Sequence, residues 1–246
     1  MPQDAMLRRI SFYADLSDDD IARVADMDGR SRTFDRNTEI IDAGQKLDCV
    51  FIVREGWAIR YKTLEDGRRQ VLNVLLPGDI FDLQVMVAAE ADHSVLAVTE
   101  VGAWIVRPET FEGLLTQSSS LSCAMWWMQV QEEAFLREQI MRNGKQTARE
   151  RIGHFLLELH RRIRIAGFGK VESFRMPLTQ GIIADALGLT PIHTNRVLRQ
   201  MQRERLIERD KGWVKFIDAE RLAEICQFDP SYFHLDAMRS RLGRRV

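Results

Sequence analysis

Residues 178–207 constrain the fold of this chain more than any other stretch, because they follow the pattern of two short helices joined by a tight turn. Ala184 is small enough for two helices to pack closely, and Gly188 can turn the chain without a Cβ clash. Thr190 suits the N-cap of the second helix, and Pro191 suits its first position. The stretch therefore predicts a helix-turn-helix.

The second predicted helix has a polar side and an apolar side. Its polar side carries His193, Asn195, Arg196 and Arg199. Its apolar side carries Val197, Leu198 and Met201. Because side chains near the N-terminus of such a helix reach base edges in the major groove, the pattern predicts DNA binding. An ordinary helical hairpin in a protein core is the alternative.

Residues 208–216 indicate a short basic hairpin that turns at Lys211-Gly212. A hairpin of this kind directly after the second helix is the wing of a winged helix-turn-helix. A plain surface hairpin is the alternative, but the position in the chain favours a wing.

The charge of the chain is divided unevenly. Residues 1–145 hold 16 Lys and Arg against 24 Asp and Glu, a net charge of −8, and residues 146–246 hold 19 against 12, a net charge of +7. We therefore expect only the C-terminal part to contact a polyanion. Phosphate contacts would make that binding depend on salt.

The composition is that of a globular protein. The chain has 246 residues, 45% of them hydrophobic, which suggests two domains or one large one. No apolar run approaches the about 18 residues of a membrane span, and the N-terminus lacks the apolar core of a signal peptide, so we expect a cytoplasmic protein without membrane contact. Cys49, Cys123 and Cys226 are too far apart for a zinc finger and are expected to be small buried residues.

The N-terminal part is expected to contain a helix followed by β-structure. Residues 5–30 have a helical pattern in which Ser17 is the N-cap before Asp18-Asp19-Asp20. Residues 31–110 are punctuated by glycine and predict an all-β barrel or sandwich with a hairpin at Asp66-Gly67. The predicted strand segments are 38–41, 49–53, 57–61, 70–76 and 97–106.

Residues 118–142 are expected to form one long helix with two apolar stripes. The stripe with coiled-coil spacing is Cys123, Trp127, Val130, Ala134 and Met141. The second stripe is Leu121, Met125, Met128 and Phe135. Two stripes predict one contact with the chain's own barrel and one with a partner subunit, and a core helix in a monomer is the alternative. Asn143-Gly144 is expected to end this helix, and another helix is expected over 146–165.

The order of these elements resembles the Crp/Fnr family of bacterial transcription regulators over nearly the whole chain. The most specific segments are 55–58, 66–70, 76–81, 179–190 and 195–201. The resemblance implies an α+β fold with an N-terminal β-roll like that of cyclic-nucleotide-binding domains, a long dimerisation helix and a C-terminal winged helix-turn-helix.

The resemblance also implies the domain boundaries and the partners. It assigns residues 1–117 to a β-roll sensor domain with an N-terminal helix, 118–143 to the dimerisation helix and hinge, and 144–246 to the DNA-binding domain with a basic tail. It implies a homodimer through residues 118–142 that binds an inverted repeat in double-stranded DNA. We expect RNA polymerase as a further partner.

The effector site departs from the pattern of the cyclic-AMP-binding members, which carry Gly-Glu and, further on, Arg-Ser. Here Asp82-Leu83 and His93-Ser94 stand at those positions. Leu83 cannot accept a ribose hydrogen bond, His93 lacks the guanidinium fork, and Asp82 adds a negative charge, so cyclic AMP is disfavoured. The candidate pocket residues are Asp82, Leu83, His93, Ser94, Leu136 and Arg137.

The sequence also favours neither of two other sensory groups, an iron–sulfur cluster and heme, so the cofactor is unknown. The iron–sulfur members need an N-terminal cysteine cluster, and no cysteine precedes Cys49, so that cluster is disfavoured. His93 and Cys49 are conceivable heme ligands, although a structural role for His93 is favoured. The β-roll is expected to bind an unidentified ligand or to act without one.

The DNA-reading residues also depart from the family pattern, in which a Glu often follows the capping Ser or Thr by two positions. Ile192 stands there and is expected to contact a thymine methyl group, while Arg196 reads guanine and Asn195 reads adenine. The expected DNA contacts are Thr179, Gln180, Thr190, Ile192, His193, Asn195, Arg196, Arg199 and Lys211, of which Gln180 and Arg199 are expected on phosphate. Non-specific contacts are conceivable for the tail arginines Arg239, Arg241, Arg244 and Arg245.

Two other classes of function fit parts of the pattern. A β-roll module that controls a protein partner without specific DNA binding is the first alternative, and the helix-turn-helix with its wing argues against it. An enzyme is the second, but the sequence has no Ser/His/Asp signature, phosphate-binding loop or metal-ligand spacing. The sequence therefore predicts a dimeric transcription regulator that is not an enzyme.

Overall fold

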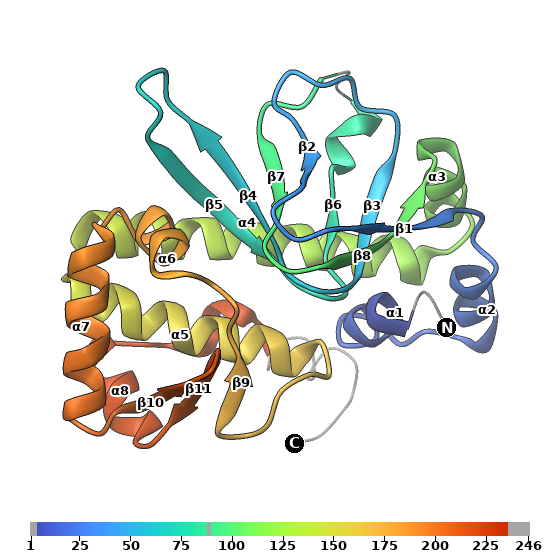
Figure 1. Ribbon diagram of the computed structural model, residues 1–246. Helices are drawn as coiled ribbons and strands as arrows, with labels where there is room; N and C mark the ends of the chain where they lie inside the picture. The colour runs from blue at the N-terminus through green and yellow to red at the C-terminus, as the bar shows by residue number, and fades with distance from the viewer. Residues whose placement is uncertain (1–3, 88–89, 236–246) are drawn as a thin grey trace.

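The computed structural model describes residues 4–87 and 90–235, which form two domains joined by a long helix (Figure 1). The chain begins with two short helices, α1 (Asp4–Ile10) and α2 (Asp18–Ala25). Ser17 caps α2 as predicted, because its hydroxyl accepts from the Asp20 backbone N–H and the Asp20 carboxylate accepts from the Ser17 N–H. One continuous helix over 5–30 was wrong, since this cap starts a new helix and a strand already begins at Arg30.

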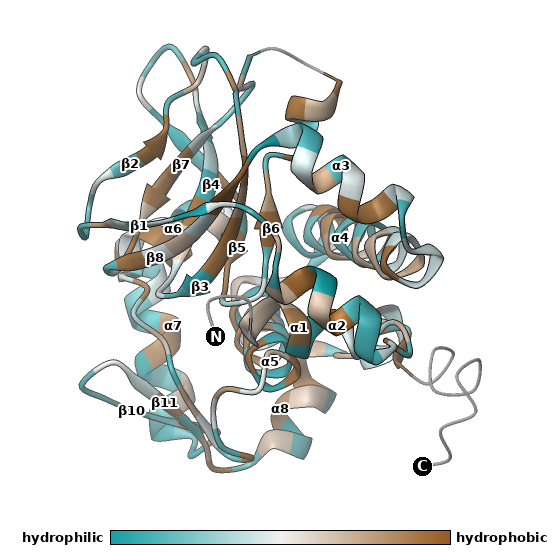
Figure 2. Ribbon diagram, turned by 90° about the vertical axis from the view of Figure 1, so that its right-hand side faces the viewer, coloured by the Kyte–Doolittle hydropathy of each residue, from teal (hydrophilic) through white to brown (hydrophobic). Residues whose placement is uncertain are grey.

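Two four-stranded antiparallel sheets form the N-terminal domain, in the orders β1-β8-β3-β6 and β2-β7-β4-β5. Phe51 and Phe81 from the first sheet share one apolar core with Val95 from the second, which confirms the predicted β-roll. Figure 2 shows β2, β6 and β7 largely in brown. The strands are β1 (Arg30–Phe34), β2 (Glu39–Ile41), β3 (Val50–Glu55), β4 (Ala58–Thr63), β5 (Arg69–Leu75), β6 (Ile80–Phe81), β7 (Ser94–Ala97) and β8 (Val101–Val106).

The segment 97–106 was predicted as one strand and is instead a corner between the two sheets. Strand β7 ends at Ala97 and belongs to one sheet, and β8 begins at Val101 in the other. The backbone N–H groups of Val98 and Thr99 both donate to the carbonyl of Trp57, which fixes the corner. The corner residues Val98, Thr99 and Glu100 include no glycine or proline, so the sequence carries no turn signal at the break.

Helix α3 (Pro108–Thr116) leads into α4 (Ser119–Lys145), which runs along the β-roll and reaches the C-terminal domain (Figure 1). The stripe of Leu121, Met125, Met128 and Phe135 is buried, as predicted for the contact with the chain's own core. The stripe that was predicted to face a partner subunit differs from the apolar stripe that is exposed, because its member Ala134 is buried. The large apolar side chains that face solvent on α4 are Trp126, Val130, Leu136, Ile140 and Met141.

Helix α4 does not end at Asn143-Gly144 as predicted, but continues to Lys145. The Asn143 side chain donates to the carbonyl of Ala186 at 3.1 Å and so contributes to a contact between domains. The chain bends at Gln146, and Thr147 caps the next helix, α5 (Ala148–Ile165), with a capping box. The boundary between α4 and α5 is therefore set by the capping box at Thr147, more than by Asn143-Gly144.

The C-terminal domain packs its helices around a three-stranded sheet of order β10-β11-β9. Ile152, Phe155, Leu156 and Leu159 of α5 are buried in its core, as predicted. Its remaining elements are β9 (Ser173–Arg175), α6 (Gln180–Leu187), α7 (Pro191–Arg203), β10 (Ile207–Asp210), β11 (Trp213–Phe216), α8 (Ala219–Cys226) and η2 (Pro230–Phe233).

The sequence also led to expectations for the cysteines, the tail arginines and membrane-spanning helices. Cys49 and Cys226 are buried as predicted, while Cys123 is only half-buried. The tail arginines 239, 241, 244 and 245 lie outside the described residues. Across residues 4–87 and 90–235, each helix is too short or too polar to span a membrane.

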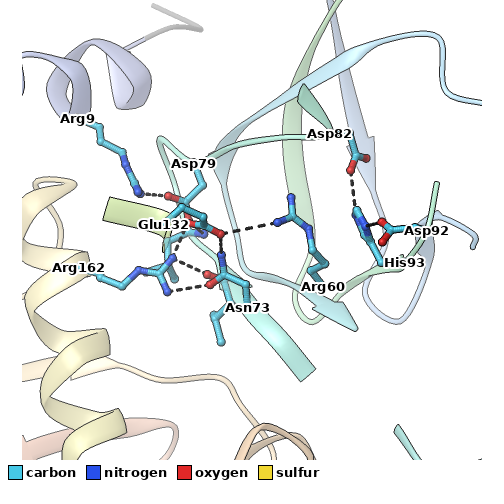
Figure 3. Close-up of polar contacts among 11 residues, drawn as sticks. Arg9, Arg60, Asn73, Asp79, Asp82, Asp92, His93, Glu132 and Arg162 are labelled. Carbon is cyan, nitrogen blue, oxygen red and sulfur yellow. Dashed lines mark hydrogen bonds and ion pairs between the residues drawn. The ribbon is translucent and has the colours of Figure 1, made fainter. Parts of the chain in front are cut away.

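One buried carboxylate, Asp79, holds the two domains together (Figure 3). Arg162 of α5 donates to Asp79 Oδ2 at 3.1 Å, to the carbonyl of Val74 at 2.7 Å and to Asn73 Oδ1 at 3.1 Å. Arg9 of α1 forms an ion pair with the other oxygen of Asp79. All three charged side chains are buried, so this Asp79 network (Arg9, Asn73, Asp79 and Arg162) joins α1, β5 and the C-terminal domain.

We expect Asp79→Ala to lower the free energy of unfolding by about 3–5 kcal/mol, because two buried guanidinium groups would lose their anion. Urea unfolding followed by circular dichroism measures the loss. Asp66→Ala removes an exposed carboxylate from the β4–β5 turn and should change stability by less than about 0.5 kcal/mol. Equal small losses in both variants would show that the network does not stabilise the fold.

A second prediction concerns pH, because burial and the charge of Arg142 lower the pKa of His154 on α5 to about 4. Arg142 donates to His154 Nδ1 at 2.9 Å, which fits a neutral ring. The unfolded chain binds this proton more tightly than the folded one. Stability should therefore be unaffected by this group above pH ~6.5 and fall by about 3 kcal/mol as the pH drops towards ~4.

His154→Gln should flatten this part of the stability profile, since glutamine does not titrate. Thermal unfolding at a series of pH values compares the two proteins. An unchanged slope between neutral and acidic pH in the variant would assign the acid sensitivity to other groups.

Candidate nucleic-acid interface and effector cavity

The helix-turn-helix is built by local capping and a single left-handed residue. The Thr179 hydroxyl accepts from the Ile182 N–H at 3.2 Å and starts α6. Gly188 then adopts φ +63°, which turns the chain, and the Thr190 hydroxyl accepts from the His193 N–H at 3.2 Å to start α7. Ala184 is fully buried. These features confirm the predicted helix-turn-helix.

The solvent side of α7 is the side that the sequence predicted. Val197, Leu198 and Met201 are buried. Ile192 is 84% exposed in the first turn, an unusual environment for an isoleucine, and Arg196 and Arg199 are also exposed. His193 and Asn195 are half-buried on the same helix.

The wing is a tight hairpin beside α7. Strands β10 and β11 pair from Ile207↔Phe216 to Asp210↔Trp213, and the turn residues Lys211 and Gly212 both have positive φ. Positive φ at both central residues is typical of a type I′ turn, whose twist matches that of the two paired strands. The predicted turn at Lys211-Gly212 is therefore confirmed.

A groove with a cavity of about 280 Å³ lies between α7 and the wing. It brings together four residues that the sequence selected, Gln180, Asn195, Arg199 and Lys211. Its other lining residues were missed, and they include Gln202, Arg209, Asp210 and Trp213. The signal for the wing residues lay in the hairpin register, which places the residues flanking the turn next to the helix. Gln202 lies three residues after Arg199 on α7, and helical spacing could have selected it.

Polar side chains meet around Asp82 and His93, two residues that the sequence analysis selected for the effector pocket. Asp82 follows β6, precedes the short helix η1 (Leu83–Met86) and has φ +60°, a conformation that favours glycine. Its buried Oδ1 lies 2.9 Å from His93 Nε2, and His93 Nδ1 lies 2.8 Å from Asp92. Lys62 and His93 together lower the pKa of the Asp92 carboxyl well below its usual range. Asp82, His93, Asp92 and Lys62 thus form a polar chain, most of which Figure 3 shows.

A cavity of about 330 Å³ lies between this polar chain and α4. We call it the effector cavity because it contains predicted pocket residues, and it is a candidate site. Of the predicted pocket residues, Asp82, Leu83, His93 and Leu136 line it. Ser94 and Arg137 do not, because the Ser94 hydroxyl accepts from the Ala43 N–H and Arg137 forms an ion pair with Glu133. The lining residues that sequence analysis missed include Arg60, Asn73, Gln84 and Glu132, which only the folded chain brings together.

The geometry also bears on heme ligation. Both ring nitrogens of His93 contact carboxylates, so neither is left for a metal. Burial, aided by Asp48, raises the pKa of the Cys49 thiol to about 12, which keeps it from the thiolate form that binds metals. In the part of the chain that the structure describes, no group of three His, Cys, Asp or Glu side chains has the arrangement of a metal site.

Comparisons with known families follow the two domains. Residues 31–118 match the cyclic nucleotide-binding domain, and residues 150–225 match the Crp-like helix-turn-helix domain. The match to the first domain covers the β-roll and includes Asp82 and His93.

Relatives and a solved structure extend the similarity over most of the chain. The transcriptional activator protein FnrL of Cereibacter sphaeroides is 30% identical over 197 residues, covering 78% of this chain and 79% of that protein. The nitrogen fixation regulation protein FixK of Rhizobium meliloti is also 30% identical over 197 residues, covering 79% and 86%. The structure of FixK2 from Bradyrhizobium japonicum shares the fold, with a TM-score of 0.72 at 24% identity over 80% of this chain and 97% of that one. The chain therefore belongs to the Crp/Fnr family of DNA-binding transcription regulators.

Proposed function

We propose that this protein regulates transcription in the cytoplasm as a homodimer that binds an inverted repeat and contacts RNA polymerase. The observation that carries the proposal is the groove between α7 and the wing, which gathers amide, guanidinium and ammonium groups and one carboxylate, Asp210, beside an exposed first turn. Such groups are the ones that contact phosphates and base edges.

The first turn of α7 supplies the base-reading residues of this proposal. Ile192 presents a methyl-rich surface for thymine, Asn195 presents an amide for adenine, and Arg196 presents a guanidinium for guanine. Among the described residues no carboxylate pairs with Arg196 or Arg199, which leaves both charges for DNA. Lys211 at the tip of the wing and Gln180 at the start of α6 are assigned to phosphates.

The outer face of α4 supplies the dimer contact. Trp126 and Ile140 are each 74% exposed, and Val130 lies between them on the same side at helical spacing. An apolar stripe of this kind on a long helix is stabilised by pairing with its copy. A two-fold dimer would place its half-sites about one helical turn, or roughly 10 bp, apart.

The Asp79 network supplies a connection between the β-roll and the DNA-binding helices. Arg162 links α5 to β5, and Arg69 of β5 pairs with Asp185 of α6 at 2.8 Å. Gln70 also donates to the carbonyl of Ala186 at 3.2 Å. A change in β5 would therefore alter the position of α6 and the DNA affinity. Since Leu83 and His93 offer no phosphate or ribose site, an effector other than cyclic AMP is proposed.

We expect Arg196→Ala to abolish base preference at one base pair in each half-site, at a loss of about 1–3 kcal/mol per contact. Binding of the unmutated protein and the variant to matched and single-substituted sites measures this preference. Arg107→Ala removes an exposed arginine from the N-terminal domain and serves as the control, with preference unchanged. Equal affinity of the unmutated protein for matched and substituted sites would refute the assignment.

We expect the double variant Trp126→Glu/Ile140→Glu to sediment as a monomer, because four carboxylates would face each other across the dimer contact. Its affinity for a full inverted repeat should fall towards that for one half-site. Val171→Glu adds a charge at an exposed apolar residue in the C-terminal domain and should leave the dimer intact. A double variant that remains dimeric would place the subunit contact elsewhere.

A further inference from the structure

The effector cavity has the size and walls of a small-molecule site. Its volume of about 330 Å³ is at the lower end of the range of about 300–1,000 Å³ that such sites occupy. Strand β5 and helix α4 supply apolar walls through Leu72, Leu75, Met128 and Leu136. A ring or a short aliphatic body would fit against these side chains.

Five of the lining residues each carry a buried polar atom without a hydrogen-bond partner among the described residues. Two of these atoms belong to the Arg9–Asp79 ion pair, and three lie outside it. They are the acceptor Asp82 Oδ2 and the donors Gln84 Nε2 and Arg60 Nε. The Asp82 side chain is fully buried, and its backbone has a left-handed conformation that is unfavourable for a residue with a Cβ atom. Unpaired buried atoms and backbone strain both destabilise a fold, and they occur together at functional sites.

The charges around the cavity select against an anion. Of the residues lining the cavity, four are carboxylates: Asp79, Asp82, Asp92 and Glu132. Setting His93 aside, four cations line the cavity or pair with these carboxylates: Arg9, Arg60, Lys62 and Arg162. Because these charges balance, a bound anion would add an uncompensated charge next to Asp82.

We propose that the cavity binds a small molecule without net charge, which donates a hydrogen bond to Asp82 and offers an acceptor to Arg60 and Gln84. Both uncharged and zwitterionic molecules of about the size of a nucleoside or an amino acid meet this description. The proposal rests on the regulatory function proposed above, since it names the class of effector.

The walls of the cavity connect this ligand to the DNA-binding domain. Figure 3 shows Arg60 between the Asp82–His93–Asp92 chain and Glu132. Arg60 Nη1 lies 3.7 Å from Glu132 Oε1. Asn73 donates to Glu132 and accepts from Arg162 of α5. An acceptor that draws Arg60 away from Glu132 changes the hydrogen bonding of Asn73, and thereby that of Arg162.

Thermal unfolding of the full-length protein with a fixed set of probes tests the ligand class. Adenosine and cyclic AMP form a matched pair that differs by the charged phosphate, L-tryptophan is a zwitterion and agmatine is a cation. At millimolar concentration we expect adenosine or L-tryptophan to raise the Tm by about 3 °C or more, and cyclic AMP and agmatine to raise it less.

Two variants locate the site. Asp82→Asn should remove the Tm shift. Gln84→Met changes a half-buried residue and should reduce the Tm shift, so it tests the site even if Asp82→Asn folds poorly. Asp66→Asn makes the same charge change at an exposed turn and should retain the shift. The proposal is overturned if cyclic AMP gives the largest shift, if no probe gives one, or if the shift survives both cavity variants.

DNA binding is measured separately on the same samples. A probe that raises the Tm should also change the affinity for DNA at least about threefold, a coupling at the low end of allosteric effects. Tm shifts without any DNA binding by the unmutated protein would count against the proposed function and leave the ligand class intact. DNA binding without Tm shifts would support the proposed function and count against the ligand class.

Discussion

The buried charge of Asp79 is the interaction on which the arrangement of this protein depends. Two arginines from different parts of the chain, Arg9 and Arg162, meet at this one carboxylate, and the backbone N–H of Leu76 donates to it at 2.7 Å. A charge buried in this way is stable only if its partners stay in place. The position of the C-terminal domain is therefore tied to the turn that follows β5, next to the effector cavity.

The same arrangement connects the β-roll to the helix-turn-helix through one strand. Strand β5 contributes Asn73 to the cavity, Val74 to the Arg162 contact and Arg69 to the contact with α6. One strand thus contacts the cavity and both helices that set the position of α7. The polar chain from Asp82 to Lys62 contributes Asp82, His93 and Asp92 to the lining of this cavity.

Local signals made much of this structure predictable. Thr190 and Pro191 start α7, Gly188 turns the chain before it, and Lys211-Gly212 turns the wing, because each feature depends on a few neighbouring residues. Features that depend on contacts distant in sequence were missed. The corner at 98–100 has no glycine or proline to mark a turn, the outer face of α4 depends on how much of the helix the β-roll covers, and the cavity wall comes from β4, β5 and α4. His93 could be selected from an aligned position, but Arg60 and Glu132 could not.

The central claim is that α7 and the wing read a specific inverted repeat as part of a dimer. Selection of genomic fragments by the purified protein, without added ligand and followed by sequencing, tests it most directly. The account predicts enrichment of an inverted repeat whose half-sites are centred about 10 bp apart. Recovery of all fragments in proportion to their abundance, at both low and moderate salt, would contradict it.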